Sequence, residues 1–481
     1  MEYVVGIDLG TSAVKTMLLG RDGAVAAERS QRLALIQDQV GHSEQDPEAW
    51  VNAVITCLRQ LPVQAHEVKG ISLSGQMHGL VLLNKEGKPL RHAILWNDTR
   101  TTAQCEYIHD VVGRQELQQI TNNWALEGFT LPKLLWVKEH EPEIYEQAEV
   151  FLLPKDYVRY RLTGVIGTDY SDAAGTLLLD TIKKAWSNEL MQALHIKSSM
   201  CPPIFESTEE AGRILSSIRL YGECTVFAGG ADNACGAVGA GVLEHGDTLA
   251  SIGTSGVVLS QSSTPQTGLH FFNHASPHDH YIMGVTLSAG DALEWFRKTF
   301  ASQTSYSELM HLASQSVPGA NGLLFAPYIN GERMPHTDAK ARGSFIGIDR
   351  QHTLEDFARA VVEGITYSLN DCLQFMHVDQ VIAIGGGARS SFWLQMQADI
   401  FNRPVITRAS EQGPGYGAAI IATVGCGWYS SLKECARDYL TISSTYQPSN
   451  EYGKAFKTFQ EVYNATKLMN DQLTDFRKSL K

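Results

Sequence analysis

Two short segments, residues 10–12 and 253–256, combine glycine with threonine and serine, whose side chains carry hydroxyl groups. Each segment follows an apolar stretch rich in β-branched residues. A second apolar stretch comes after each segment, and this pattern is typical of a β-hairpin. Glycine allows positive φ and close approach, so such a hairpin tip can offer N–H groups and hydroxyls to an anion. Both tips are therefore candidate phosphate-binding turns. Their residues are Gly10, Thr11 and Ser12 in the first turn and Gly253, Thr254 and Ser255 in the second.

An acidic side chain, Asp8, lies two residues before Gly10 and so shares a strand face with it. A carboxylate beside a bound phosphate repels it unless a cation lies between the two. Mg²⁺ is the cation we expect, held by Asp8 directly or through water. The alternative is that Asp8 only shapes the turn. Two phosphate-binding hairpins in one chain predict a duplicated domain that binds a nucleotide from both sides, and hence a kinase or an ATPase.

Three consecutive glycines follow an apolar stretch at 381–384 and precede a segment with helical periodicity. Bare backbone lets a large, flat group lie close, and the N-terminus of the following helix can face a phosphate. The cluster therefore predicts the nucleoside side of the site, with a purely structural turn as the alternative. Its spacing is not Gly-x-Gly-x-x-Gly, which disfavours a Rossmann dinucleotide site. The residues of this cluster are Gly385, Gly386, Gly387 and Ala388.

The elements that must position these side chains alternate between strand and helix patterns, which predicts an α/β fold. Residues 3–27 predict antiparallel strands, and 68–73 and 225–228 predict strands that run directly into polar segments. Pro47 predicts the first residue of a helix that Asp46 caps. Small residues at 413–419 predict the start of a closely packed helix.

A chain of 481 residues exceeds what one hydrophobic core usually supports, so we expect two domains, residues 1–245 and 246–481. The net charge of −13 argues against nucleic acid or an anionic membrane as a partner. Eight cysteines without a Cys-x-x-Cys pair are typical of reduced thiols in a cytoplasmic protein. No secretory signal opens the sequence, and the longest apolar stretch, 418–424, is too short to span a membrane. We therefore expect a cytoplasmic protein.

Several of these motifs occur in an order that resembles the FGGY family of carbohydrate kinases, from residue 3 to about residue 425. The segments 128–140 and 343–363 are similar to family signatures. The resemblance implies two actin-like (ribonuclease H-like) ATPase domains with a cleft between them, Mg-ATP as the donor and a sugar in the cleft. The motifs that carry it are residues 8–12, 75–79, 96–98, 154–157, 172–176, 230–233, 253–256 and 385–388.

The resemblance assigns the role of general base to Asp232. This residue lies where a predicted strand ends and a helix begins, so the alternative is an N-cap aspartate. The positive end of the helix would keep its carboxylate ionised. An ordinary low pKa is adequate, because the base takes the proton late in a loose phosphoryl-transfer transition state.

The resemblance also implies that Met77 and His78 contact the sugar, and imidazole suits a sugar hydroxyl because it offers a donor and an acceptor without adding charge. Asn233 is expected to hold a neighbouring hydroxyl. Trp96 is expected to line the sugar pocket, with the alternative that residues 96–98 start a helix capped by Asn97 or Asp98. Lys15 either neutralises phosphate charge or is a solvated strand residue, and the loop at 331–333 receives no assigned role.

The implied function is phosphorylation of D-xylulose at O5, with Asp8 and Asp232 as catalytic residues, ATP and Mg²⁺ as cofactors and no nucleic acid or membrane partner. A homodimer is one option for its assembly. One alternative is a kinase for a related ketose or polyol, such as ribulose or ribitol. Another is an actin-like or chaperone-like ATPase that switches protein partners, although Asp232, Met77 and His78 favour the kinase.

Overall fold

The computed structural model describes residues 1–218, 220–222, 224–409 and 413–480, and the chain divides into two compact units. The first unit comprises Met1–Leu243 together with Phe271–His280 and Gln412–Leu440. The second comprises Glu244–His270, Tyr281–Glu411 and Thr441–Lys481. The main segment of the first unit ends near the expected boundary, but two later segments also belong to that unit. The division at residue 245 therefore stays a prediction.

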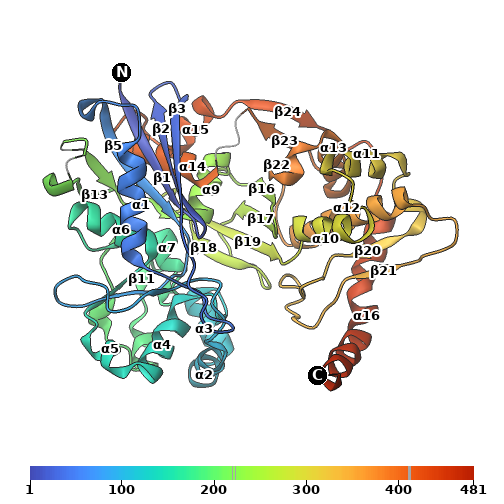
Figure 1. Cartoon of the computed structure of the whole chain (residues 1–481), viewed down its shortest axis with the longest axis horizontal. Coiled ribbons are helices and arrows are strands. Elements are labelled where there is room, and N and C mark those ends of the chain that lie inside the picture. The colour runs from blue at the N-terminus through green and yellow to red at the C-terminus, as the bar shows by residue number, and fades with distance from the viewer. Residues whose placement is uncertain (219, 223, 410–412, 481) are drawn as a thin grey trace. The chain divides into compact units, whose positions relative to one another are not determined.

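A mixed sheet with the strand order β13-β14-β5-β1-β2-β3 forms the centre of the first unit, and β15 also pairs with β5 (Figure 1). β1 is antiparallel to β2 and parallel to β5, which in turn is parallel to β14 and β15. The strands are β1 (Tyr3–Leu9), β2 (Ala13–Gly20), β3 (Val25–Arg32), β5 (Val68–Gly75), β13 (Glu210–Arg213), β14 (Thr225–Phe227) and β15 (Gly230–Ala231).

Helices pack on both faces of this sheet, because side chains alternate between the faces along each strand. Val5 belongs to a core that includes Trp50 of α1 (Pro47–Arg59) and residues of α6 (Pro154–Thr163). Gly6 faces α14 (Gly413–Gly425), where a Cβ on Gly6 would lie 2.0 Å from the Gly415 carbonyl oxygen. α14 also packs on α9 (Asp232–Ala240). The close packing expected for residues 413–419 is therefore confirmed.

Short strand pairs and further helices complete the first unit. The pairs are β4 (Glu44–Gln45) with β7 (Ala93–Ile94), β6 (Val81–Leu83) with β8 (Val150–Leu152), β9 (Thr168–Asp169) with β12 (Ile204–Phe205), and β10 (Leu179–Asp180) with β11 (Ala185–Trp186). The helices are α2 (Thr102–Val112), α3 (Arg114–Thr121), α4 (Thr130–His140), α5 (Pro142–Gln147), α7 (Tyr170–Ala174), α8 (Asn188–Ala193) and α15 (Leu432–Tyr439).

The second unit contains strands in the order β19-β17-β16-β22-β23-β24. β16 is antiparallel to β17 and parallel to β22, so this unit repeats the arrangement of β1, β2 and β5 in the first. The strands are β16 (Asp247–Ile252), β17 (Gly256–Gln261), β19 (His280–Thr286), β22 (Gln380–Gly385), β23 (Val405–Arg408) and β24 (Ile442–Tyr446), with β18 (His270–Asn273) at the boundary between the units and a separate pair β20 (Leu324–Ala326) and β21 (Ser344–Ile346).

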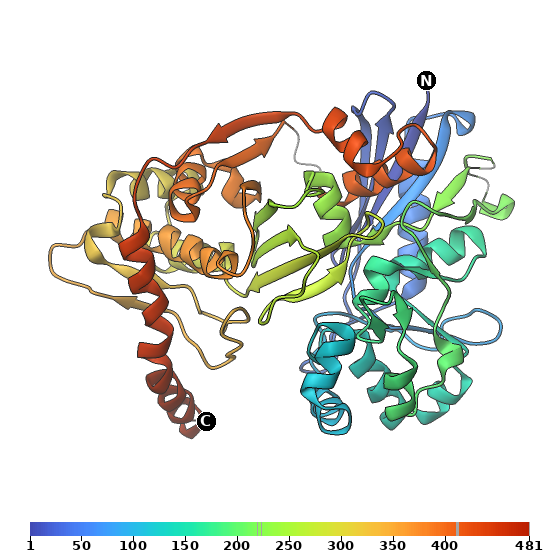
Figure 2. The ribbon, with the colours of Figure 1, turned by 180° about the vertical axis from the view of Figure 1, so that it is seen from behind.

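The helices of the second unit pack around its sheet, and the last of them is long (Figure 2). Phe456, Phe459 and Val462 of this helix are buried, whereas Leu468 and Met469 further along it are exposed. Among the described residues, no helix is long and apolar enough to cross a membrane. The helices are α10 (Gly290–Phe300), α11 (Tyr306–Gln315), α12 (Leu354–Leu373), α13 (Ser391–Phe401) and α16 (Gly453–Ser479).

Both predicted hairpins are confirmed, and so is the predicted helix start at Pro47. In the first hairpin the Gly10 N–H donates to the Ala13 carbonyl over 3.1 Å, and Ser12 is exposed at the tip. The Asp46 carboxylate caps α1 by accepting a hydrogen bond from the backbone of Glu48. These features depend on residues close in sequence, and the local pattern is enough to predict them.

Candidate functional site

β5 lies between two parallel neighbours, β1 and β15, whose ends carry acidic residues. The register pairs Asp8 of β1 with Ser74 of β5, and Ser74 with Gly230 of β15. Asp232 follows Gly230 by two residues and begins α9. The carboxyl ends of parallel strands meet at one edge of a sheet. Two carboxylates from distant parts of the sequence, Asp8 and Asp232, therefore lie at the same strand edge.

Asp232 is the first helical residue of α9, and Ala231 is the N-cap, so the N-cap alternative is wrong. Its Oδ1 accepts a hydrogen bond from the Asn233 N–H over 2.7 Å. Burial and then the negative charge of Asp8 raise the pKa of Asp232 to about 7, against the lowering effect of the Asn233 N–H. The expectation of an ordinary low pKa is therefore wrong. The helix end does not compensate for desolvation beside a second carboxylate.

Asp8 has one hydroxyl and one ammonium group as neighbours. The Ser74 hydroxyl donates to Asp8 Oδ1 over 3.4 Å, and Lys15 is its cross-strand partner on β2. Burial raises the pKa of Asp8 to about 6, although Lys15 and Ser74 both lower it. Two partly buried carboxylates form the hard oxygen donor set that Mg²⁺ prefers, because a cation would relieve both their desolvation and their repulsion.

The tip of the first hairpin is fastened to the segment after β5. The Thr11 hydroxyl donates to Gln76 Oε1 over 2.8 Å and accepts from Trp96 Nε1 over 2.9 Å. Gln45 Nε2 donates to the Thr11 carbonyl over 2.8 Å. Trp96 is 43% exposed, so its ring remains accessible although its N–H is engaged. The structure thus links a predicted phosphate-binding residue with a predicted sugar-binding residue.

The alternative for residues 96–98, a helix start capped by Asn97 or Asp98, is wrong. α2 begins at Thr102, and its N-cap is Thr101 rather than Asn97 or Asp98. The Asp98 carboxylate instead forms an ion pair of 2.6 Å with the Arg100 guanidinium. Asp98 also accepts hydrogen bonds from the backbone N–H groups of Arg100 (3.0 Å) and Ser43 (2.6 Å), but the residues that follow it directly do not form a helix.

His78 is held in one orientation by the residue that follows α7. Its backbone φ of 69° lies in the left-handed region, which is uncommon for histidine and costs energy. Its Nδ1 lies 2.6 Å from the Gly175 carbonyl oxygen. A carbonyl oxygen only accepts, so Nδ1 carries the proton in this contact. The Phe129 ring packs against the imidazole at 4.7 Å.

Met77 connects this segment with α9. Its side chain is buried, and Asn233 Nδ2 donates to its sulfur over 3.4 Å. The structure therefore brings Met77 next to the residue that follows Asp232. Met77 and Asn233 therefore meet near the carboxyl ends of β5 and β15, and their roles and that of Asp232 stay predictions.

The tip of the second hairpin is held by the start of α10. The Gly253 carbonyl accepts a hydrogen bond of 2.8 Å from the Gly290 N–H, and the Thr254 carbonyl accepts bonds of 3.0 and 3.1 Å from Ala289 and Asp291. A Cβ on Gly290 would lie 2.4 Å from the Gly253 oxygen, so only glycine fits there. The position of this tip therefore depends on α10.

A cavity of about 780 Å³ in the second unit adjoins this tip and the third glycine cluster. Of the predicted nucleotide-binding residues, Gly253, Thr254, Gly386 and Gly387 line it, whereas Ser255, Gly385 and Ala388 do not. Its size falls within the range of small-molecule sites. The other lining residues come from the end of β16, from the 3-10 helix at Gly386–Arg389, from α10 and α11, and from α13 with its N-cap Ser390. They are Ile252, Gly290, Asp291, Leu293, Glu294, Tyr306, Ser307, Met310, His311, Ser314, Arg389, Ser390, Ser391, Phe392 and Trp393.

The loop at 331–333, which had no assigned role, contains a buried carboxylate, Glu332, that contacts the chain just before α10. Glu332 Oε1 accepts hydrogen bonds from the Leu287 N–H (3.0 Å) and the Arg333 N–H (2.7 Å), and Oε2 accepts from the Ser368 hydroxyl (3.3 Å). Burial raises the pKa of Glu332 to about 7, since these hydrogen bonds offset only part of its desolvation. Glu332 therefore connects its loop with the chain leading to α10.

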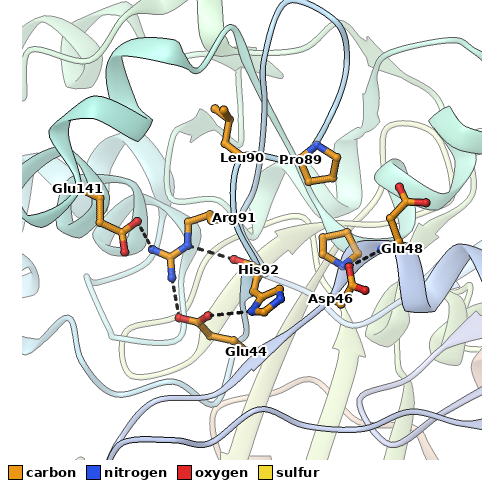
Figure 3. A pocket seen from close by; sticks show the side chains of 9 residues that line it. Glu44, Asp46, Glu48, Pro89, Leu90, Arg91, His92 and Glu141 are labelled. Carbon is orange, nitrogen blue, oxygen red and sulfur yellow. Dashed lines mark hydrogen bonds and ion pairs between the residues drawn. The ribbon is translucent and has the colours of Figure 1, made fainter.

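A hollow of about 480 Å³ on the first unit contains none of the predicted site residues among those that line it (Figure 3). Arg91 lies between Glu44 and Glu141, at 2.6 Å from each. Pro47, Glu48 and His92 also line the hollow. The charged groups at its centre, Arg91, Glu44 and Glu141, already pair with one another, so they are not arranged to bind a ligand.

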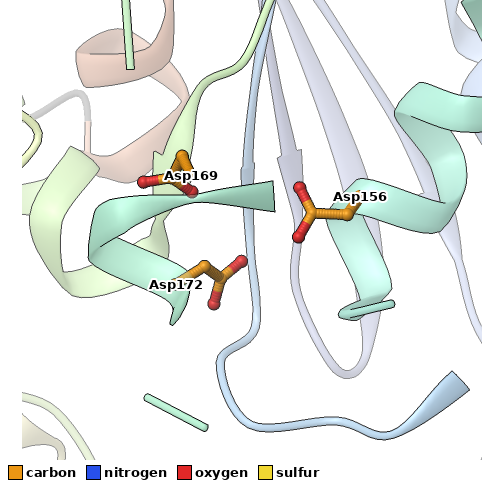
Figure 4. Close-up of side chains that lie close together, drawn as sticks. All are labelled: Asp156, Asp169 and Asp172. Atoms are coloured by element: carbon orange, nitrogen blue, oxygen red, sulfur yellow. The ribbon is translucent and has the colours of Figure 1, made fainter. Parts of the chain in front are cut away.

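Three buried aspartates, Asp156, Asp169 and Asp172, lie close enough together to resemble a metal site (Figure 4). The Lys155 ammonium, however, lies at 2.6 Å from Asp156, 2.7 Å from Asp169 and 3.2 Å from Asp172. Lys155 and all three aspartates are inaccessible to solvent. Arg159, also buried, lies 3.7 Å from Asp156, so the positive charges in this cluster are those of Lys155 and Arg159.

Sequence reasoning missed several residues that hold the site. Gln76 and Gly175 stand inside motifs that support the family resemblance, and Ser171 lies directly before one of them, so the motifs were a signal that these segments matter. No local pattern assigns a role to any of the three. The cavity walls on α10 and α11 carried no signal, because ordinary amphipathic helices have the same residue types.

Comparison with known proteins gives a consistent match for both parts of the chain. Models described as the N-terminal and C-terminal domains of the FGGY family of carbohydrate kinases match residues 3–239 and 248–426. A xylulose kinase of Bacillus subtilis (strain 168) is 50% identical over 500 aligned positions, which cover all of both chains.

Solved structures agree with this result. A ligand-bound xylulose kinase from Lactobacillus acidophilus has a TM-score of 0.93 and 27% identity, covering 98% of this chain and 100% of that one. A gluconate kinase from the same organism has a TM-score of 0.91 and 28% identity, covering 97% and 98%. The predicted fold of two α/β domains of the actin-like type is confirmed.

Proposed function

The chain belongs to the FGGY family of carbohydrate kinases, and we propose that it uses ATP to phosphorylate D-xylulose at O5, giving D-xylulose 5-phosphate. The observation that carries the mechanism is the pair of carboxylates at the ends of β1 and β15, where Asp232 has a pKa near neutrality. The observation that favours D-xylulose is the full-length similarity to a xylulose kinase at 50% identity.

Asp232 is the general base in this proposal. Its carboxylate accepts the proton of the sugar hydroxyl while that oxygen attacks the γ-phosphorus of ATP. A base with a pKa near the working pH combines a large ionised fraction with useful proton affinity. The raised pKa therefore suits this role better than the ordinary value expected from the sequence. Proton transfer comes late, so Asp232 also serves to orient the hydroxyl.

Asp8 is the proposed holder of Mg²⁺, directly or through water. Its oxygen atoms and its proximity to a second carboxylate fit a hard divalent cation. The bound cation would neutralise charge on the phosphates of the donor. Asp8 itself places negative charge beside the Gly10–Ser12 turn, where a phosphate could be held only with such a cation present.

His78, Met77, Trp96 and Asn233 are the proposed sugar contacts. His78, whose Nδ1–H is directed to the Gly175 carbonyl, would contact a sugar hydroxyl. Met77 and the accessible ring of Trp96 supply apolar surface for the C–H groups of a sugar. Asn233 lies directly beside the base and can accept or donate to a neighbouring hydroxyl.

The cavity of about 780 Å³ is the proposed adenosine site, because bare backbone of Gly386 and Gly387 forms part of its wall. The adjoining turn at 253–255 and the turn at 10–12 are the proposed phosphate-binding segments. Because the residues of these turns carry no charge, Mg²⁺ would neutralise the negative charge of the phosphates. Gly385 and Ala388 stay predictions for the same site. Eight free cysteines support a reducing, cytoplasmic location, and a homodimer remains a proposal.

A sugar panel tests the substrate. ADP release should be fastest with D-xylulose and at least ~10-fold slower in kcat/KM with ribulose, ribitol and gluconate, since hydroxyl positions are read by buried polar groups. A preference for another sugar would replace D-xylulose while keeping the kinase. The gluconate kinase among the structural relatives makes gluconate a necessary member of the panel. ATP hydrolysis that no sugar changes would favour the switch ATPase instead.

A further inference from the structure

α7 is a helix of five residues whose two ends contact the two halves of the proposed reaction site. Near its start, the Ser171 hydroxyl accepts a hydrogen bond of 2.9 Å from the Ala231 N–H. Directly after its end, the Gly175 carbonyl accepts the bond from His78 Nδ1 at 2.6 Å. Ala231 is the residue before Asp232 in the chain. One short rigid segment therefore sets the spacing between the base and a sugar contact.

The Ser171 hydroxyl has a fixed direction because of Asp169. Asp169 Oδ2 accepts hydrogen bonds from both the backbone N–H and the hydroxyl of Ser171, at 2.8 and 2.5 Å. A hydroxyl has one proton, and here it goes to the carboxylate. A lone pair of Ser171 Oγ is then directed at the Ala231 N–H. The result is a chain of hydrogen bonds from Asp169 through Ser171 to the backbone that carries Asp232.

Asp169 is in turn held by the buried Lys155. The ammonium contacts Asp169 Oδ1 at 2.7 Å, and both side chains are inaccessible to solvent. The stem of Lys155 also supports β5, because a Cβ on Gly75 would lie 2.6 Å from Lys155 Cβ. Burying charges is costly, so the presence of this cluster is weak evidence for a stabilising role.

Asp172 differs from Asp169 within the same cluster. Its Oδ2 lies 3.2 Å from the Lys155 ammonium, but neither carboxylate oxygen makes a hydrogen bond to another described group. Burial raises the pKa of Asp172 well above its usual range. Asp172 shares the lysine with Asp169, yet its carboxylate makes no hydrogen bond to the described backbone near Asp232. It therefore offers a matched control.

We infer that Asp169 and Ser171 are positioning residues, which act through the Ala231 N–H to hold the general base Asp232 at the correct distance from the sugar that His78 orients. This inference rests on the proposed function and deepens it. Neither residue touches the reacting atoms. They affect the rate because catalysis is sensitive to the position of the base: a displacement of a catalytic group by about 1 Å can lower the rate about 10²-fold.

A double-mutant cycle of Ser171→Ala and Asp232→Asn tests the inference. Ser171→Ala should lower kcat about 10- to 100-fold while the KM for ATP stays unchanged. If Ser171 acts through Asp232, adding Ser171→Ala to Asp232→Asn should cause less than a ~3-fold further loss, because the base is already absent. A merely structural role would reduce both backgrounds by the same factor, and that additive result would overturn the inference.

Two further variants keep the test decisive. Asp172→Asn changes the same cluster without touching the chain to Ala231, and it should leave kcat within ~2-fold of wild type. Ser171→Thr retains the hydroxyl and should recover most of the activity lost in Ser171→Ala. If Ser171→Ala does not fold, as judged by its melting temperature, Ser171→Cys replaces it, because a thiol has nearly the same volume but is a weak acceptor. Recovery with cysteine equal to that with threonine would contradict the role of the hydroxyl.

The outcomes separate this inference from the proposed function. Wild-type turnover in Asp232→Asn would show that the proposed base is wrong, whatever Ser171 does. Impaired turnover in Asp232→Asn, together with normal turnover in Ser171→Ala, would reject the positioning role while the kinase mechanism stands. A large loss in Asp172→Asn equal to that in Ser171→Ala would mean that the cluster acts as a whole through stability.

Discussion

Asp8 lies near the end of β1, and Asp232 directly follows β15 as the first residue of α9. Ser74 of the intervening strand β5 pairs with Asp8 on one side and with Gly230 on the other. Burial raises the pKa of Asp8 to about 6, and burial together with the negative charge of Asp8 raises the pKa of Asp232 to about 7. A pair of neighbouring acids whose pKa values differ from their ordinary range is typical of a catalytic site.

Replacing Asp232 by asparagine should lower turnover by at least ~10²-fold, because the amide keeps the size of the side chain but cannot accept the proton. The KM for ATP should change little, since the proposed adenosine site lies in the second unit. Steady-state kinetics with D-xylulose measures both values. Turnover equal to that of wild type would contradict the assignment.

The pH dependence of turnover should report the same carboxylate. Only ionised Asp232 accepts a proton, so kcat should fall as the pH drops, with a midpoint at or below about 7. A bound cation would move the midpoint lower because it favours the ionised form. Asp232→Asn is the control. The fall in kcat at low pH that comes from protonation of Asp232 should be absent in this variant, whereas any fall that comes from protonation of ATP should remain.

Asp8→Ala should impair turnover and raise the Mg²⁺ concentration needed for half-maximal activity, because the carboxylate helps to order the cation or its waters. Titration of Mg²⁺ at a fixed, saturating ATP concentration measures the effect. Lys15→Ala serves as a comparison, since it removes the cross-strand partner of Asp8 and leaves the carboxylate in place. An unchanged Mg²⁺ requirement with full activity would return Asp8 to the role of shaping the turn.

Filling the proposed adenosine cavity should weaken ATP binding. Ser314→Trp adds a large ring to a residue that lines the cavity, and we expect the KM for ATP to rise about 10-fold or more with little change in the KM for the sugar. Gln315→Trp is the matched control, because Gln315 is the next residue of α11, is exposed and is not among the cavity's lining residues. Equal effects of both substitutions would place the nucleotide elsewhere.

Glu332→Gln should stabilise the protein at high pH but not at low pH. The folded-state pKa of Glu332 is raised from 4.5 to about 7. Below about pH 4.5 the carboxyl is protonated in both the folded and the unfolded protein. Between pH 4.5 and about pH 7 the folded protein keeps a proton that the unfolded chain has lost. Stability therefore falls as the pH rises through this window, by on the order of 1–3 kcal/mol. Melting curves at pH 4.5 and pH 8 should show a gain for the glutamine variant only at pH 8.

The hairpins, the helix start at Pro47 and the α/β class could be predicted because each depends on residues that are close in sequence. The Gly10 turn lies between two strands that pair with each other, and Asp46 lies beside the N–H group that it caps. In such cases a local pattern contains both partners of the interaction. The alternative that Asp232 is an N-cap residue is wrong by one position, which is the usual uncertainty of a helix end.

The amino-acid sequence by itself determined the glycine and hydroxyl turns, the strands before them and the family to which the chain belongs, since these follow from residue type and short spacing. Only the tertiary structure decided the register that brings Asp8 beside Asp232, the raised pKa values that follow, and the bonds from α7 to Ala231 and His78. These features depend on pairing across long stretches of chain and on burial. Desolvation and the distances between charged groups exist only in the folded molecule. They determine the pKa values of side chains, which residue type alone does not fix.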